Sequence, residues 1–207
     1  MRIGLVAEPW WVNLAILVPV AAYFSWRRSS IPITARQLII VAVFASAFGF
    51  VEATVVVYLR AASGLLPGYQ GTLADVVRLT RQPQPTAIRE LPPSLVALEM
   101  FREAATMFML ISVALLAPLK ARARVAVFLW AFAIWDAAYY GSLWATIRWP
   151  QSLTDRDVLF LIPQPWFAPV WFPLLVCALT MLAILLTRAN ARRVVADSIH
   201  EGPAFDR

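Results

Sequence analysis

Cysteine and histidine are nearly absent from this chain of 207 residues, which contains one of each. The single thiol, Cys177, excludes an intrachain disulfide and a metal cage built from thiolates. The single imidazole, His200, lies in the polar C-terminal stretch. Haem sites, zinc sites with imidazole ligands and catalytic triads based on histidine therefore lack a ligand or a base in the apolar part of the chain. The sequence also contains no nucleotide-binding loop.

Charge is the second scarcity, and it defines the class of protein. Charged residues make up 14% of the chain and hydrophobic residues 61%, with a mean hydropathy of +0.70. Soluble domains contain about 25% charged and roughly 45–50% apolar residues. The composition therefore predicts an integral membrane protein whose first partner is the lipid bilayer. The net charge of +6 comes almost entirely from arginine, without a basic patch interleaved with aromatics, so we expect no nucleic-acid partner.

Apolar runs are what the sequence has in abundance, and they predict an all-α fold. About five runs are long enough for a hydrocarbon core of ~30 Å. The expected spans cover about residues 10–26, 37–59, 94–117, 125–149 and 166–187. Residues 60–93, rich in proline and glycine, are predicted to form an outer loop, and residues 188–207 a polar tail. The chain is thus predicted to be a single membrane domain, a polytopic transmembrane helix bundle.

One further segment, residues 152–163, is too short to cross a membrane. Its first four residues, Ser152 to Asp155, match the pattern of a capping box that would open a short helix ending at Pro163. We therefore expect an interfacial or re-entrant segment between the fourth and fifth spans.

Basic residues at alternate ends of the spans predict the orientation. They are Arg27, Arg28 and Arg36 after the first span, Lys120, Arg122 and Arg124 after the third, and Arg188, Arg192 and Arg193 after the fifth. Positive residues favour the cytoplasmic side, so the N-terminus is expected outside and the C-terminus in the cytoplasm. The loop 60–93 carries four arginines, but charges in long loops count for less.

The sequence Glu99-Met-Phe-Arg-Glu103 places charge where hydrocarbon is expected. With a rise of about 1.5 Å per residue, Glu52, Glu103 and Tyr140 fall at similar depths, roughly 12 Å below the outer ends of their spans. Small residues near Glu52, including Gly49 and Ala53, predict close packing of another helix against it. The candidate ion-, proton- or substrate-binding residues are Glu52, Glu99, Arg102, Glu103, Asp136, Tyr139 and Tyr140, with Asp155 and Asp157 as a candidate outer rim.

Two interpretations of these charges stay open. An ion pair of Arg102 that locks the second and third spans together explains part of the pattern without any chemistry. One arginine does not neutralise four carboxylates, however, and each unpaired one costs at least ~2.5 kcal/mol at the membrane centre. The remaining carboxylates must be protonated, hydrated or bound to a cation. No cofactor is predicted; a divalent cation, if present, would be held by Glu52, Glu103 and Asp136.

Motifs in the last third of the chain resemble a known kind of protein. They are Trp135-Asp136, Tyr139-Tyr140, Trp149-Pro150, Asp157 with the run from Leu159 to Pro163, and Pro165-Trp166. The pattern is similar to that of uncharacterised bacterial polytopic membrane proteins. The resemblance implies a multi-pass protein of the bacterial cytoplasmic (inner) membrane, and it implies no activity or functional residue.

Three functions from different classes are compatible with the sequence. The first, which we favour, is an ion- or proton-coupled transporter or permease for a small ion or solute, with Arg102 as counter-ion. The second is a membrane-embedded enzyme that acts on a lipid or polyprenyl substrate, with carboxylates as acid and base or as metal ligands. The third is a non-catalytic subunit of a larger membrane complex. A pathway through so thin a bundle is also compatible with a homo-oligomer.

Overall fold

A computed structural model describes residues 6–28, 31–62, 93–117 and 120–200 of the chain. The described residues are mostly helical and form five α-helices, one 3₁₀ helix and two strands. In chain order these are the 3₁₀ helix η1 (Trp10–Ile16), α1 (Leu17–Trp26), α2 (Ala35–Ala62), α5 (Pro93–Leu116), α6 (Ala121–Ile147), β1 (Arg156–Phe160), β2 (Trp166–Pro169) and α7 (Trp171–His200). The predicted outer loop lies outside the described residues from 63 to 92, as do the last seven residues of the tail.

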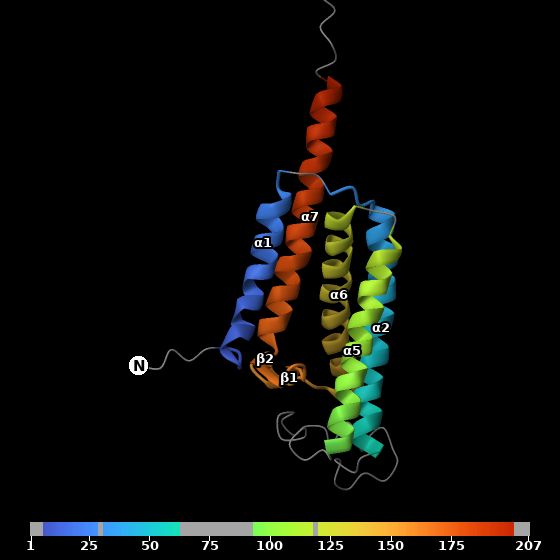
Figure 1. Ribbon diagram of the computed structural model, residues 1–207, viewed down its shortest axis with the longest axis vertical. Helices are drawn as coiled ribbons and strands as arrows, with labels where there is room; N and C mark the ends of the chain where they lie inside the picture. Colours follow the sequence, from blue (N-terminus) through green and yellow to red (C-terminus); the bar gives the residue numbers. More distant parts are fainter. Residues whose placement is uncertain (1–5, 29–30, 63–92, 118–119, 201–207) are drawn as a thin grey trace, which may run out of the picture.

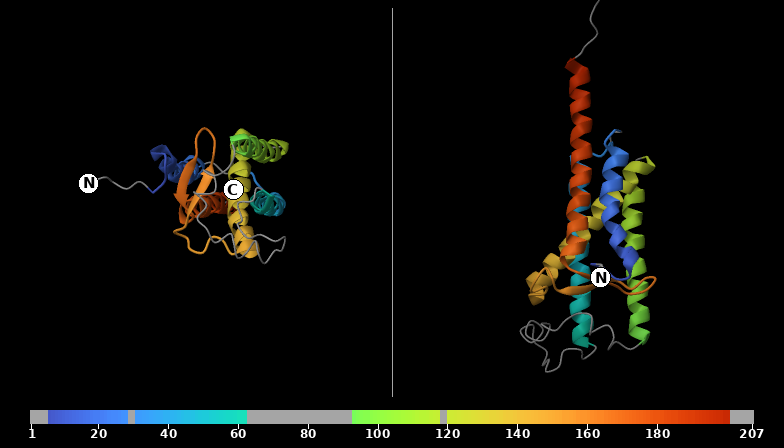
Figure 2. Two further views of the ribbon diagram at one scale, coloured as in Figure 1. Left: turned by 90° about the horizontal axis from the view of Figure 1, so that it is seen from below. Right: turned by 90° about the vertical axis from the view of Figure 1, so that its left-hand side faces the viewer.

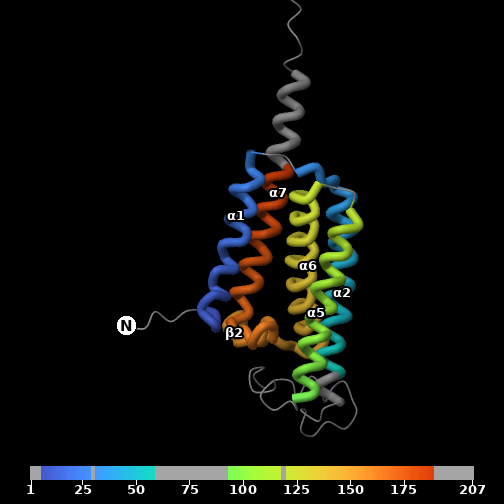
Figure 3. The backbone as a smooth tube through the Cα atoms, viewed as in Figure 1, coloured from blue at the N-terminus to red at the C-terminus, as the bar shows by residue number. Residues whose placement is uncertain are grey.

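The helices run alternately up and down, roughly side by side (Figures 1 and 3). Helix α6 is central, because it contacts α2, α5 and α7, while α1 packs on α7. The ends of α1, α5 and the start of α6 meet at one end of the bundle. The strands lie towards the opposite end, next to the ends of α1 and α7, and α2 and α5 extend past them (Figures 1 and 2). This end also carries the predicted site, as shown below.

Within the described part of the chain, three helices are long and apolar enough to cross a membrane, over Ala35–Tyr58, Ala121–Ile147 and Trp171–Arg188. Large apolar side chains on their outer faces are exposed, including Ile39 and Val43 of α2 and Leu182 and Leu186 of α7. An apolar surface of this extent is unfavourable in water and indicates contact with lipid. The fold therefore supports a membrane protein.

The first predicted span contains few residues, but it is longer than an α-helix with the same number of residues. Its seven residues from Trp10 to Ile16 are in a 3₁₀ helix and the next ten are in α1. A 3₁₀ helix rises about 2.0 Å per residue, so this part is about 14 Å long. The α-helical part adds about 15 Å, and the sum approaches the ~30 Å of a hydrocarbon core.

Helix α2 begins at a reciprocal cap and packs closely on α6. The backbone N–H of Gln37 donates to Thr34 Oγ1 at 3.2 Å, and the N–H of Thr34 donates to Gln37 Oε1 at 2.9 Å, which is a capping box. Further along, a Cβ on Gly49 would lie 2.5 Å from the Trp135 carbonyl oxygen. The predicted close approach of a helix near Glu52 is confirmed at Gly49 and at the fully buried Ala53.

The prediction of an all-α chain missed the strands. β1 and β2 pair antiparallel, with Arg156 opposite Pro169 and Val158 opposite Phe167. The capping-box interpretation of residues 152–155 is wrong, because these residues form a turn that leads into β1 instead of a helix. The seven residues between Asp155 and Pro163 are too few for a stable helix, whereas the first five of them satisfy backbone groups by pairing with β2.

Helix boundaries differ from the predicted spans by a few residues. The fifth span differs most: residues 166–169 belong to β2, so that α7 begins only at Trp171. At its other end α7 continues to His200, so the described part of the predicted tail is helical.

The contact at Gly49 gives a test of this packing. Gly49→Ala is expected to destabilise the protein by about 1–3 kcal/mol, because the new methyl group meets backbone atoms that cannot move without separating α2 from α6. Gly141→Ala in α6 is the matched control, since a Cβ there has no neighbour within 4 Å. Thermal unfolding in detergent would measure both variants. Equal midpoints for the two variants would contradict the close approach.

Candidate functional site

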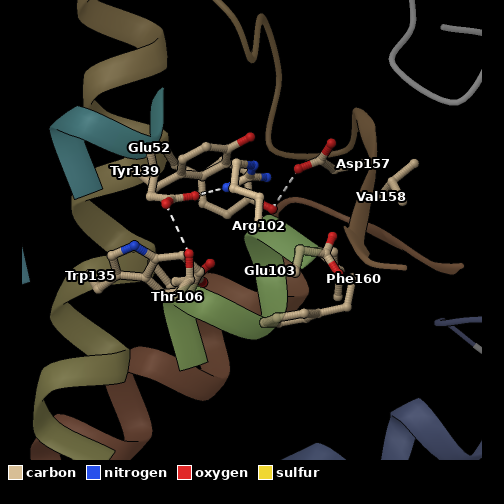
Figure 4. Close-up of a pocket in the computed structure, with 12 residues that line it drawn as sticks. Glu52, Arg102, Glu103, Thr106, Trp135, Tyr139, Asp157, Val158 and Phe160 are labelled. Carbon is tan, nitrogen blue, oxygen red and sulfur yellow. Dashed lines mark hydrogen bonds and ion pairs between the residues drawn. The ribbon is translucent and has the colours of Figure 1, made fainter. Parts of the chain in front are cut away.

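An ion pair between two helices forms the centre of the candidate site (Figure 4). Arg102 Nη1 from α5 pairs with Glu52 Oε2 from α2. The Glu52 side chain is only 7% exposed, and its other oxygen accepts a hydrogen bond of 2.9 Å from Thr106 Oγ1. Both oxygens of this buried carboxylate therefore have a partner, which is the condition for tolerating a charge in apolar surroundings. The pairing of Glu52 with Arg102 that the depths suggested is confirmed.

Arg102 is shared with a second carboxylate on its own helix. Its Nη2 lies 2.8 Å from Glu99 Oε2, and its Nε donates to the same oxygen at 2.9 Å. The guanidinium thus connects a carboxylate of α2 to one of α5. Its fork of planar donors suits this arrangement better than a lysine ammonium would.

The β1–β2 region closes one end of the site. Glu103 Oε2 accepts a hydrogen bond of 2.8 Å from the backbone N–H of Leu161, which follows β1. Tyr140 of α6 donates its hydroxyl to Asp157 Oδ2 of β1 at 2.9 Å. Asp157 is 4% exposed. Two buried polar contacts therefore attach the strands to α5 and α6.

Asp136 lies deeper and has a different partner. The thiol of Cys177, on α7, donates to Asp136 Oδ2 at a distance of 3.4 Å between sulfur and oxygen. A thiol is a weak donor, so this contact offers the carboxylate little compensation. Among the hydrogen-bonded carboxylates of the site, Asp136 therefore has the weakest donor.

A polar cavity of about 60 Å³ lies between these groups. Its volume holds a few water molecules or a small cation with water, since one water needs about 10–15 Å³ by this measure. Four carboxyl groups and one guanidinium line it. The lining residues are Glu52, Arg102, Glu103, Thr106, Trp135, Asp136, Tyr139, Tyr140, Asp157, Val158, Leu159 and Phe160. Carboxyl groups thus outnumber guanidinium groups around a cavity that is large enough for a small cation.

One donor at this cavity has no acceptor. Trp135 is 8% exposed, and its indole Nε1 is buried with no hydrogen-bond partner among the described residues. A buried donor without a partner costs about 1–3 kcal/mol. This cost would be removed by a water or ligand oxygen in the cavity.

Most of the predicted site residues come together around this cavity. Six of the seven residues predicted for ion, proton or substrate binding line the cavity. The exception is Glu99, which is linked to the cavity only by its ion pair with Arg102. The two predicted rim residues separate. Asp157 lines the cavity, whereas Asp155 accepts hydrogen bonds from the backbone N–H groups of Gln151 and Ser152 and holds the turn before β1. The structure shows proximity, and the roles of these residues stay predictions.

Sequence reasoning missed several residues of the site. Thr106 is one helical turn beyond Arg102 and Glu103, a spacing that does identify it as a neighbour of the charged stretch. Trp135 and the apolar β1 residues from Val158 to Phe160 carry no comparable signal, because the strand pairing that brings β1 to the cavity is a tertiary feature. Cys177, which the sequence identifies only as the single thiol, is buried and contacts Asp136.

The sequence names Glu52, Glu103 and Asp136 as ligands only for the case that a divalent cation binds, and this assignment stays a prediction. Among the residues that the structure describes, no group of three or more histidine, cysteine, aspartate or glutamate side chains is placed to hold a metal ion. Glu52, Glu103 and Asp136 each have a different hydrogen-bond partner instead, namely Thr106, the Leu161 backbone and Cys177. These carboxylates face one cavity without converging on one point.

Comparisons of the chain with protein-family models, with curated proteins and with solved structures gave no match, so they identify no family.

Proposed function

We propose that all five helices cross the membrane, with the N-terminus outside and the C-terminus in the cytoplasm. The alternating directions of the helices support this topology (Figure 1), as does the length of η1 with α1. Arg27, Arg28 and Lys120 lie at the end opposite to the strands, and positive residues favour the cytoplasmic side. The resemblance of residues 135–166 to bacterial polytopic proteins supports the bacterial cytoplasmic (inner) membrane as its location.

Cysteine labelling in intact cells tests this topology. In a Cys177→Ser background, Leu153→Cys marks the turn before β1, and Arg28→Cys marks the end of α1; both positions are exposed. A membrane-impermeant maleimide is expected to label position 153 in intact cells, and position 28 only after the membrane is permeabilised. The opposite pattern would reverse the orientation. Labelling of both positions in intact cells would place them on the same side of the membrane. This result would contradict an odd number of spans between positions 28 and 153.

In this proposal the cavity binds a cation or protons. The entry of these ions is coupled to the movement of a small solute. The observation that carries this proposal is the imbalance of four carboxyl groups against one guanidinium around a cavity of about 60 Å³. Ionisable groups inside a membrane are costly, and they commonly mark ion pathways or proton relays. The space suits a small cation with water, and not a large solute.

The contacts divide the roles of the charged residues. Arg102 is the fixed counter-ion, which Glu52 and Glu99 hold from two helices. Asp136 is the proposed binding carboxylate, because its contact with Cys177 compensates its charge least. Glu52 and Glu103 complete the negative lining. A change in the charge of Glu52 would alter the contact between α2 and α5, and a change in the charge of Asp136 would alter the contact between α6 and α7. In this way occupancy of the cavity would be coupled to movement of the helices.

Ion flux into proteoliposomes tests the proposal. Reconstituted wild-type protein is expected to acidify the vesicle interior under an inside-negative potassium diffusion potential, or to admit sodium in a parallel assay. Asp136→Asn and Glu52→Gln are each expected to lower this flux at least tenfold, because both remove a carboxylate of the cavity. Glu8→Gln is the matched control, since Glu8 is 66% exposed and lies outside the cavity.

Two results would contradict coupled transport. One is a wild-type flux of protons and of sodium equal to that of protein-free liposomes. The other is normal flux in both Asp136→Asn and Glu52→Gln, with each variant shown by size-exclusion chromatography to be folded.

A further inference from the structure

An apolar groove adjoins the polar cavity. Its volume is about 420 Å³, within the range of roughly 300–1,000 Å³ that is typical of small-molecule sites. Ala104, Met107 and Phe108 of α5 line one side. Phe132 of α6 and Ile162 and Trp166 from the β1–β2 region line the rest. Phe108 is 69% exposed, so the groove opens on the outer surface of the bundle, where the apolar helices face lipid.

Glu103 and Phe160 belong to both spaces, because each lines the groove and also the polar cavity. Phe160 stacks on Phe132 with ring centroids 6.2 Å apart and contacts Trp166 at 5.3 Å. These aromatic rings make a rigid wall. At the polar end of this wall, the Glu103 carboxylate accepts the Leu161 N–H and so has a fixed position. A single molecule could therefore contact hydrocarbon-like surface and a carboxylate together.

Unpartnered donors occur in the walls of both spaces. The indole Nε1 atoms of Trp135, in the cavity wall, and Trp166, in the groove wall, are buried without a hydrogen-bond partner among the described residues. Each lacks an acceptor, and the missing contact costs about 1–3 kcal/mol. An occupant with oxygen atoms near its polar end would supply one.

Charge restricts the polar end of such an occupant. Among the described residues that line the groove, only Glu103 is charged. The adjoining cavity adds three further carboxyl groups and one guanidinium, which is already paired with Glu52 and Glu99. An anionic head would be repelled by these groups. A hydroxyl or ammonium head would donate to the carboxylates instead, and a hydroxyl would also accept from an indole N–H.

We propose that the groove binds an amphiphile, with a hydrocarbon chain against Met107, Phe108 and Phe132 and a hydroxyl or ammonium head at Glu103. The amphiphile comes from the bilayer, which the groove faces; a ligand that binds only when added from outside would overturn this source. This assignment does not depend on ion coupling. If transport is established, the groove identifies an amphiphile as the solute or as a lipid regulator of the same site.

Photo-crosslinking with matched probes tests the proposal on the full-length protein in nanodiscs. Three probes with the same diazirine-bearing chain would differ only in the head, which would be an alcohol, an amine or a carboxylate. We expect saturable labelling of residues 104–108 by the alcohol and the amine, located by tandem mass spectrometry. The carboxylate probe is expected to label at least fivefold less, and Glu103→Gln should reduce this difference.

Two neighbouring positions on α5 supply the matched variants. Ala104→Trp fills the groove and is expected to lower the labelling at least fivefold. Ala105→Trp places the same side chain on the exposed face of the helix next to the groove and should leave the labelling unchanged. Native mass spectrometry of the wild type and of Ala104→Trp separates the sources, because a bilayer lipid will co-purify with the wild type only, whereas an external ligand will bind only when added.

Labelling that does not saturate and is equal in both tryptophan variants would overturn the proposal, because it would show ordinary contact with surrounding lipid. Equal labelling by all three heads would overturn the assignment of the head. Failure of the proposed ion coupling would be seen separately, as absent flux in proteoliposomes together with normal crosslinking.

Discussion

The charge of Arg102 inside an apolar bundle is the constraint on which the site depends. A guanidinium in such surroundings is tolerated only with carboxylate partners, and Arg102 has two, Glu52 on α2 and Glu99 on its own helix. The link to Glu52 connects α5 to α2, whereas the main apolar packing of α5 is on α6. The pair therefore fixes which face of α5 turns inward. That orientation also directs Glu103 towards the strands and Thr106 towards Glu52.

The strands and the cavity follow from this arrangement. Glu103 holds the backbone after β1, and Tyr140 holds Asp157 within it. The strands consequently close one end of a cavity that is lined by more carboxyl groups than guanidinium groups. The same closure places Phe160 between the polar cavity and the apolar groove. A structural ion pair and a functional cavity are therefore compatible here, because the pair satisfies some of the charges and leaves others at the cavity.

Much of the helical architecture could be predicted from the sequence, because apolar runs of about 20 residues have few alternatives to a membrane-crossing helix. The pairing of Arg102 with Glu52 could be predicted as well, since orientation and rise per residue bring them to one depth. The strands could not, because pairing of five residues with four depends on tertiary contacts and not on a strong local pattern. For the same reason the partners of Asp157 and Asp136 were not foreseen: Asp157 belongs to β1, and Cys177 lies on a helix whose rotation the sequence alone does not determine.

The most direct test of the account is a double-mutant cycle on Glu52 and Arg102, measured by equilibrium unfolding in detergent. Arg102→Met leaves two carboxylates without their cation and is expected to destabilise the protein by about 3 kcal/mol or more. Adding Glu52→Gln should restore part of this loss, with a coupling energy of about 2 kcal/mol. Strictly additive effects of the two substitutions would contradict the central role of the ion pair.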